Sequence, residues 1–264
     1  MIQESLLTNH RVVTTLAALI AMAGAPSIWA DDAPPPPQGV WIGKGQFGFL
    51  DSQGNSVSQS VNGIVDLSRY DGDWKNQGTL NGLYGKSSGI VSAERWEVHE
   101  QTNYALSSDL FVFGGLRYEH DLFDGFQYQA SVTTGVGYTF INTDKANLTA
   151  QAGPGYRKLR PEAITKNGAG EVISRVPLEA TGEAIGTAGV DFSYKFNSTT
   201  TLTNKFLAES GSSNTMLQNA LALSVKMSTK LALTIGYGVT NNSNPPAPLK
   251  KLDSVETVNL QFSF

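Results

Sequence analysis

The stretch Val255-Glu256-Thr257-Val258-Asn259-Leu260-Gln261-Phe262-Ser263-Phe264 alternates between two kinds of side chain. Successive side chains of a β-strand point to opposite sides, so its apolar residues share one face and its polar residues the other. A strand that is apolar on one side, polar on the other and ends in an aromatic residue is typical of the closing strand of a transmembrane β-barrel. We therefore expect Phe262 and Phe264 to form the membrane-assembly signal of such a barrel.

The same alternation recurs along the chain. Its clearest instance is 126–140, whose apolar face is predicted to hold Phe126, Tyr128, Ala130, Val132, Val136, Tyr138 and Phe140. Counting such runs between turn signals predicts an all-β fold, a transmembrane antiparallel up-and-down barrel of about 12 strands.

Connection lengths support this fold class. The longer predicted loops, among them 86–94, 161–179 and 241–253, all follow odd-numbered strands, whereas short turns such as Asp71-Gly72-Asp73 follow even-numbered ones. An outer-membrane barrel has its long loops outside the cell and its short turns in the periplasm. A soluble β-sandwich is the alternative, and its strands do not sort their loops in this way.

The amino-terminal segment predicts secretion. Arg11 precedes an apolar run over 12–23 that is too short for a spanning helix, and Pro26 breaks it. We expect a signal peptide over 1–30 that is cleaved after Ala30, a Pro-rich periplasmic tether over 31–39, and a barrel over 40–264 in the outer membrane of a Gram-negative bacterium. No later segment is apolar enough for a helical span.

Composition narrows the function classes. The chain has 27 Gly, 9% aromatic residues and only 16% charged residues. Its net charge of −4 argues against a nucleic-acid partner, for which a basic stripe would be expected. It contains no Cys, which excludes disulfides, thiolate metal sites and lipoprotein anchoring. The sequence predicts no cofactor.

Several motifs carry a family resemblance in their order along the chain. They include Gly45-Gln46-Phe47-Gly48-Phe49, the run Tyr118-Glu119-His120-Asp121-Leu122-Phe123, and Gly153-Pro154-Gly155-Tyr156-Arg157. The chain resembles the salt-induced outer membrane proteins, the domain-of-unknown-function family 481. The resemblance implies an outer-membrane location and a link to salt or osmotic stress, but no activity. The family's usual turn has Thr in place of Ser56.

Charged residues at inward-facing positions are the candidates for function. The assigned register places seven of them in the lumen: Arg95, Glu97, His99, Arg117, Glu119, Asp191 and Lys195. We expect Glu97, Arg117 and Glu119 to form cross-strand ion pairs, because opposite charges on neighbouring strands of one face lie about 5 Å apart at Cβ. Other long inward side chains, including Arg157 and Glu209, indicate a largely filled or finely constricted interior. No catalytic or metal-binding residue is predicted, since no nucleophile has a base and orienting group beside it and no loop is dense in ligands.

These observations favour a structural or narrow passive-channel role in the envelope. The alternatives are an outer-membrane hydrolase with an active site at the rim, and a receptor or adhesin that binds through its loops. The expected partners are outer-membrane lipids and the barrel-assembly machinery, with small solutes or ions as possible cargo.

Overall fold

The computed structural model describes residues 37–52, 58–87, 89–122, 125–168 and 172–264. The predicted signal peptide and most of the tether lie outside these residues. The described part holds thirteen strands. Their bounds are β1 Trp41–Ser52, β2 Ser58–Asp71, β3 Trp74–Ser87, β4 Ile90–Ala105, β5 Leu110–Asp121, β6 Phe126–Asn142, β7 Ala146–Lys166, β8 Val172–Pro177, β9 Thr181–Lys195, β10 Thr200–Gly211, β11 Thr215–Lys226, β12 Leu231–Asn242 and β13 Leu252–Ser263.

Twelve of these strands close into an antiparallel barrel, which confirms the predicted fold class. Each pairs with its neighbours in chain order, except that β7 pairs with β9 across the short β8. The ring is closed where β13 pairs with β1, with Phe262 opposite Gly45. Just beyond, Gly43 and Phe264 exchange two backbone hydrogen bonds of 2.9 Å each, so the last residue is part of the seam.

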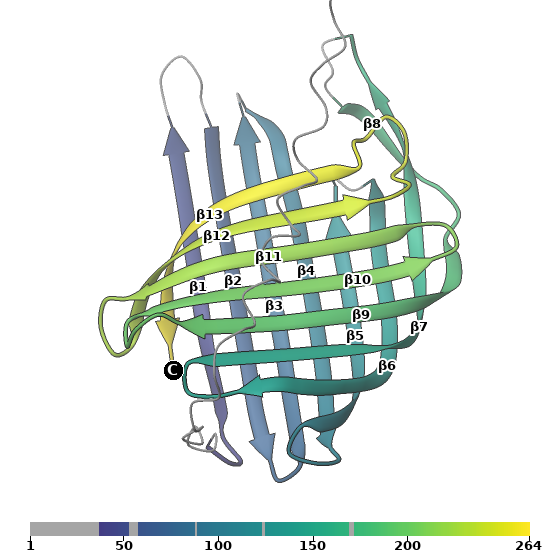
Figure 1. The fold of residues 1–264 in the computed structure, drawn as a ribbon. Coiled ribbons are helices and arrows are strands. Elements are labelled where there is room, and N and C mark those ends of the chain that lie inside the picture. The colour runs from purple at the N-terminus through teal and green to yellow at the C-terminus, as the bar shows by residue number, and fades with distance from the viewer. Residues whose placement is uncertain (1–36, 53–57, 88, 123–124, 169–171) are drawn as a thin grey trace, which may run out of the picture. The chain divides into compact units, whose positions relative to one another are not determined.

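The barrel has two walls that cross (Figure 1). Strands β1 to β5 run up the page behind, and β9 to β13 run across it in front, while β6 and β7 curve from one wall into the other. At the bend, the β6–β7 pairing is interrupted between Thr133↔Gly155 and Val136↔Ala152, where Pro154 has no N–H to donate. Gly153 allows the close approach there, since a Cβ on it would collide with the backbone of β6.

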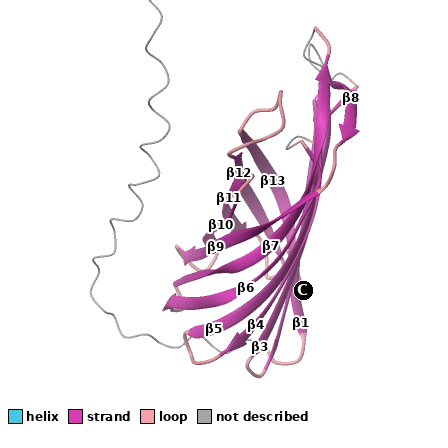
Figure 2. Cartoon of the chain, turned by 90° about the vertical axis from the view of Figure 1, so that its right-hand side faces the viewer, coloured by secondary structure: helices cyan, strands magenta, loops and turns pink. Residues whose placement is uncertain are grey.

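Connection lengths differ between the two ends of the barrel. We call the end with short turns after β2, β4, β6, β9 and β11 the turn end, and the opposite end the loop end. The loop predicted over 161–179 is wrong, because β7 continues to Lys166 and pairs with β8 in a hairpin that projects beyond the barrel (Figure 2). The loop predicted over 86–94 is also shorter, since β4 begins at Ile90.

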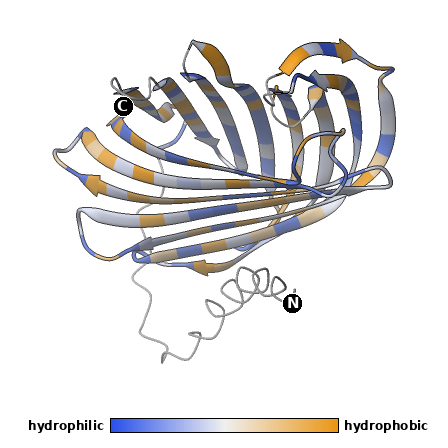
Figure 3. Ribbon diagram, turned by 90° about the horizontal axis from the view of Figure 1, so that it is seen from above, coloured by the Kyte–Doolittle hydropathy of each residue, from blue (hydrophilic) through white to orange (hydrophobic). Residues whose placement is uncertain are grey.

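Hydropathy alternates along nearly every strand, as the striped ribbons of Figure 3 show. The outward face is largely apolar and carries aromatic pairs near both ends. Trp96 stacks on Tyr118 at 5.1 Å towards the loop end, and Trp74 meets Tyr104 at 4.8 Å towards the turn end. Aromatic girdles of this kind mark the two interfaces of a membrane barrel. Among the residues described, no helix is long and apolar enough to cross a membrane.

One predicted face is wrong. Phe126 was expected beside Tyr128 on the outward face, but it is only 4% exposed. A register shift between these two residues takes Phe126 out of the alternation and places it opposite Asp121. A β-bulge adds an unpaired residue and so reverses the face of everything beyond it.

Candidate functional site: an ion-pair cluster in the lumen

Arg117 lies at the centre of a buried ion-pair cluster in the half of the lumen nearer the loop end. It is 4% exposed and stands between Gly115 and Glu119 on the inward face of β5. Its guanidinium pairs with Glu119 on its own strand and with Glu97 of β4 at 3.6 Å. Alternation along the two strands places all three side chains on one face, and the register sets Glu97 directly opposite Glu119.

The same guanidinium also reaches the other wall. Arg117 Nη1 lies 3.3 Å from Glu209 Oε2 of β10, and Nη2 lies 3.1 Å from the sulfur of Met216 on β11. Ser131 of β6 donates a 2.8 Å hydrogen bond to the other oxygen of Glu209. Strands β5 and β10 are not neighbours, so these contacts cross the lumen rather than follow its wall.

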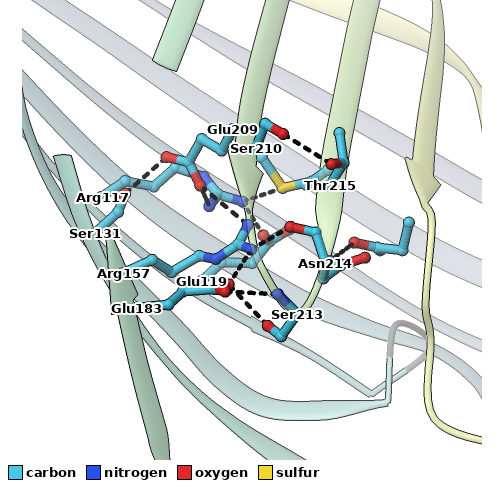
Figure 4. A network of polar contacts seen from close by, with 12 residues as sticks. Arg117, Glu119, Ser131, Arg157, Glu183, Glu209, Ser210, Ser213, Asn214 and Thr215 are labelled. Carbon is cyan, nitrogen blue, oxygen red and sulfur yellow. Dashed lines mark hydrogen bonds and ion pairs between the residues drawn. The ribbon is translucent and has the colours of Figure 1, made fainter. Parts of the chain in front are cut away.

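Arg157 of β7 forms the second centre of the cluster (Figure 4) and is fully buried. Its Nη2 atom donates to Glu183 at 2.6 Å and to the backbone carbonyl of Asn214 at 2.5 Å. Its Nη1 atom lies 3.9 Å from Glu209 Oε2, the oxygen that also pairs with Arg117. Glu209 therefore joins the two arginines.

Arg95 extends the cluster along β4. Its guanidinium lies 2.7 Å from Glu119, 3.1 Å from Glu97 and 3.6 Å from Asp121. Arg95, Arg117 and Arg157 thus share five carboxylates, those of Glu97, Glu119, Asp121, Glu183 and Glu209. With all groups ionised the cluster carries a net charge of −2.

The connection between β10 and β11 is held inward over the cluster. Glu183 accepts hydrogen bonds from the Ser212 hydroxyl and from both the backbone and the hydroxyl of Ser213. The Asn214 side chain donates to Asn242 at 2.7 Å. Pro246 and Leu249 of the β12–β13 connection lie against Gly125 of the β5–β6 connection, so chain from two further loops meets at this end.

In the lumen nearer the turn end the charged side chains are more exposed, and lysines outnumber carboxylates. Lys195 and Asp191 of β9 are exposed there, and Lys75 of β3 interacts electrostatically with Asp191 and Lys205. His99 lies between the two regions and interacts with Glu97, Arg117 and Lys205. Inward lysines are the shared feature of this region: Lys44, Lys75, Lys195, Lys205 and Lys226.

Only some of the lumen residues selected from the sequence lie in the ion-pair cluster. Arg95, Glu97, Arg117 and Glu119 lie in the cluster, whereas Asp191 and Lys195 do not. Glu183 was not among the residues predicted from the sequence. Strand β9 begins at Thr181, but the alternation recognised in the sequence starts several residues later and so leaves Glu183 outside the strand. Its alternation with Ile185 and Thr187 was the available signal.

The described residues hold no group of three His, Asp or Glu side chains arranged to bind a metal ion. The five carboxylates of the cluster are instead paired with the guanidinium groups of three arginines. The chemistry that this arrangement provides is electrostatic: it holds fixed charges of both signs in a narrow part of the lumen.

A family model described as "Protein of unknown function, DUF481" matches residues 45–264, which span the whole barrel after the start of β1. The chain belongs to the DUF481 family. Its similarity to the uncharacterised protein YdiY of Escherichia coli K12 is 23% identity over 96% of this DUF481 chain and 99% of that protein. The match does not carry the name "salt-induced", which stays a prediction.

Solved barrels with a similar fold differ strongly in sequence from the DUF481 chain. An outer membrane channel from Pseudomonas putida F1 matches with a TM-score of 0.47 and 12% identity, over 90% of this chain and 100% of the channel. The translocator domain of the autotransporter NalP from Neisseria meningitidis matches with a TM-score of 0.45 and 14% identity, over 85% and 86%.

Proposed function

We propose that this chain is an integral outer-membrane barrel that acts as a narrow passive channel for small ions, with the ion-pair cluster as its constriction. The carrying observation is that Arg117 contacts Glu209 from a non-neighbouring strand. Side chains that meet across a lumen limit what passes, and rings of fixed charge select by sign. A barrel of this strand number has a lumen that side chains can largely fill.

The charges of the constriction suggest its ion preference. Five carboxylates outnumber three guanidiniums, so the constriction favours cations over anions. The Gln101 and Gln151 amides, which exchange two hydrogen bonds of 2.9 Å between β4 and β7, narrow the passage further towards the turn end. We therefore expect a small conductance.

Planar-bilayer recording on the refolded full chain tests the proposal. We expect small single-channel currents in KCl and a reversal potential in a salt gradient that indicates cation preference. Absence of current across the accessible voltage range would overturn the channel role in favour of a structural one. Passage of solutes as large as oligosaccharides would contradict the narrow constriction.

The link to salt stress, which the family resemblance implies, is a separate part of the proposal. We expect the amount of this protein in the membrane to rise with NaCl in the growth medium. Immunoblots across a NaCl series, with sucrose at matched osmolarity as the control, distinguish a response to salt from one to osmotic pressure. Unchanged amounts in both series would remove this part and leave the channel proposal standing.

A further inference from the structure

A carboxylate faces outward halfway between the two aromatic girdles. The outward face of β4 reads Trp96, Val98, Glu100, Thr102 and Tyr104, and its first and last members belong to the aromatic pairs near the loop end and the turn end. Inward neighbours such as Glu97 are buried, whereas Trp96 and Val98 are exposed, which fixes the face. Glu100 is therefore placed at the depth where lipid chains would surround it.

The hydrogen bonding of Glu100 is incomplete within the described residues. Its carboxylate accepts one hydrogen bond, 2.8 Å from the Thr102 hydroxyl, and forms no ion pair there. Thr102 lies equally close to the side-chain oxygen of Asn76, so its single proton serves two acceptors. The Nδ2 group of Asn76 donates no hydrogen bond in the same part of the chain. An acceptor and a donor thus stand unmatched beside each other.

Another polar pair on the outward face is complete. Asn204 of β10 and Asn219 of β11 exchange two amide hydrogen bonds, of 3.0 and 3.1 Å. That pair needs nothing from outside the chain. Ionisable side chains inside a membrane are costly unless they are paired, and they commonly mark functional contacts.

We propose that the outward face around Asn76, Gly78, Glu100 and Thr102 is the contact between two copies of this chain in the membrane. The inference goes beyond the channel role and does not depend on conduction. A second copy related by a two-fold axis along the membrane normal keeps every residue at its own depth, so this polar face meets the same polar face. The Nδ2 group of Asn76 in each copy then donates a hydrogen bond to the Glu100 carboxylate of the other copy.

The shape of the face is also self-complementary. Glu100 lies directly opposite Gly78 on β3 and Leu116 on β5. Leu116 protrudes and is 57% exposed, whereas Gly78 leaves a recess. A recess of this kind lets two such faces approach each other closely, as small residues do at membrane interfaces. Lipid chains fill such a recess but supply no hydrogen-bond donor to the carboxylate.

Disulfide trapping tests this contact directly, since the natural chain has no Cys. Thr102→Cys should give a cross-linked dimer in native membranes, and Val225→Cys, outward on the other wall, should give none. Adding Gly78→Leu to Thr102→Cys should abolish the cross-link without removing a polar group. Equal cross-linking at both positions, or none at Thr102→Cys, would overturn the proposal.

Association in solution supplies an independent readout. The wild-type barrel, refolded in detergent, should sediment as a dimer, and Glu100→Leu should weaken dimerisation at least tenfold. Asn219→Leu breaks the complete amide pair and is the matched control, so its association should equal the wild type's. A monomeric wild type at all protein concentrations, or a Glu100→Leu dimer of undiminished strength, would show that this face has no second copy as its partner.

Discussion

Glu209 Oε2 lies 3.3 Å from Arg117 Nη1, although their strands β10 and β5 share no edge. The ion pair therefore ties one wall of the barrel to the other through its interior. Both side chains are almost completely buried, at 2% and 4% exposure. A contact of this kind is expected to govern both ion passage and stability.

Replacing Arg117 with Ala should raise single-channel conductance and cation preference. The change removes a bulky side chain from the constriction and shifts the net charge of the cluster from −2 to −3. Reversal potentials in a KCl gradient measure the effect. Arg69→Ala is the control, because Arg69 pairs with Asp71 on the outward face at 3.1 Å and should leave both quantities unchanged. Identical currents in Arg117→Ala and wild type would contradict the assigned constriction.

The same substitution should destabilise the barrel. Removing one partner of a buried ion pair leaves uncompensated charge, at a cost of roughly 3 to 5 kcal/mol. In Arg117→Ala/Glu209→Gln the loss should be smaller than the sum of the single losses, because the orphaned carboxylate is gone. Urea unfolding of the refolded variants measures these values, and Arg69→Ala should cost no more than about 1 kcal/mol. Strict additivity would argue against direct coupling.

The seam between β13 and β1 should be sensitive to changes that hairpin β7–β8 tolerates. Deleting Phe264 removes both backbone hydrogen bonds to Gly43, and Phe262→Arg should cost roughly 1 to 4 kcal/mol, depending on its depth in the bilayer. Ile173→Arg, on the exposed hairpin outside the barrel, is the matched control. Folding yield into vesicles measures assembly, and equal yields for the two arginine variants would contradict the assigned lipid-facing surface.

The protein should fractionate with the outer membrane and migrate faster on gels when it has not been boiled. A closed barrel leaves no free strand edge inside the bilayer and resists detergent until heated. Density-gradient separation and gels with and without boiling provide the measurement. Recovery in the soluble periplasmic fraction would refute the membrane location.

The mature chain should begin at or near Asp31. Ala30 provides the small residue required at the cleavage site, after the helix-breaking Pro26. Amino-terminal sequencing of the protein from membranes checks this expectation, and a chain that starts at Met1 would refute it.

The barrel was predictable from the sequence because alternation with a period of two reports directly on which residues face lipid. That signal is lost where the chain leaves the regular pattern. The bulge next to Phe126 turns this side chain away from the lipid-facing side. The β7–β8 hairpin projects beyond the barrel, where alternation no longer separates lipid-facing from inward residues. Strand β7 also passes through Pro161, which the sequence pattern treated as the start of a loop.

The cluster was predictable only in part. Neighbouring strands bring Glu97, Arg117 and Glu119 together, and pair register follows from alternation. The approach of Arg117 to Glu209, and of Arg157 to Asn214, depends on how far the two walls lie apart and how they cross. The alternation of residues along a single strand gives no information about the distance between the two walls.

The fixed charges are divided along the axis of the barrel. Acidic excess is concentrated near the loop end, while the inward lysines Lys44, Lys75 and Lys205 lie nearer the turn end. If the lumen conducts as proposed, an ion that enters from one side crosses the two electrostatic regions in the opposite order from an ion that enters from the other. We then expect rectification: currents at equal voltages of opposite sign should differ in size, and the direction of the larger current should report how the barrel is oriented in the bilayer.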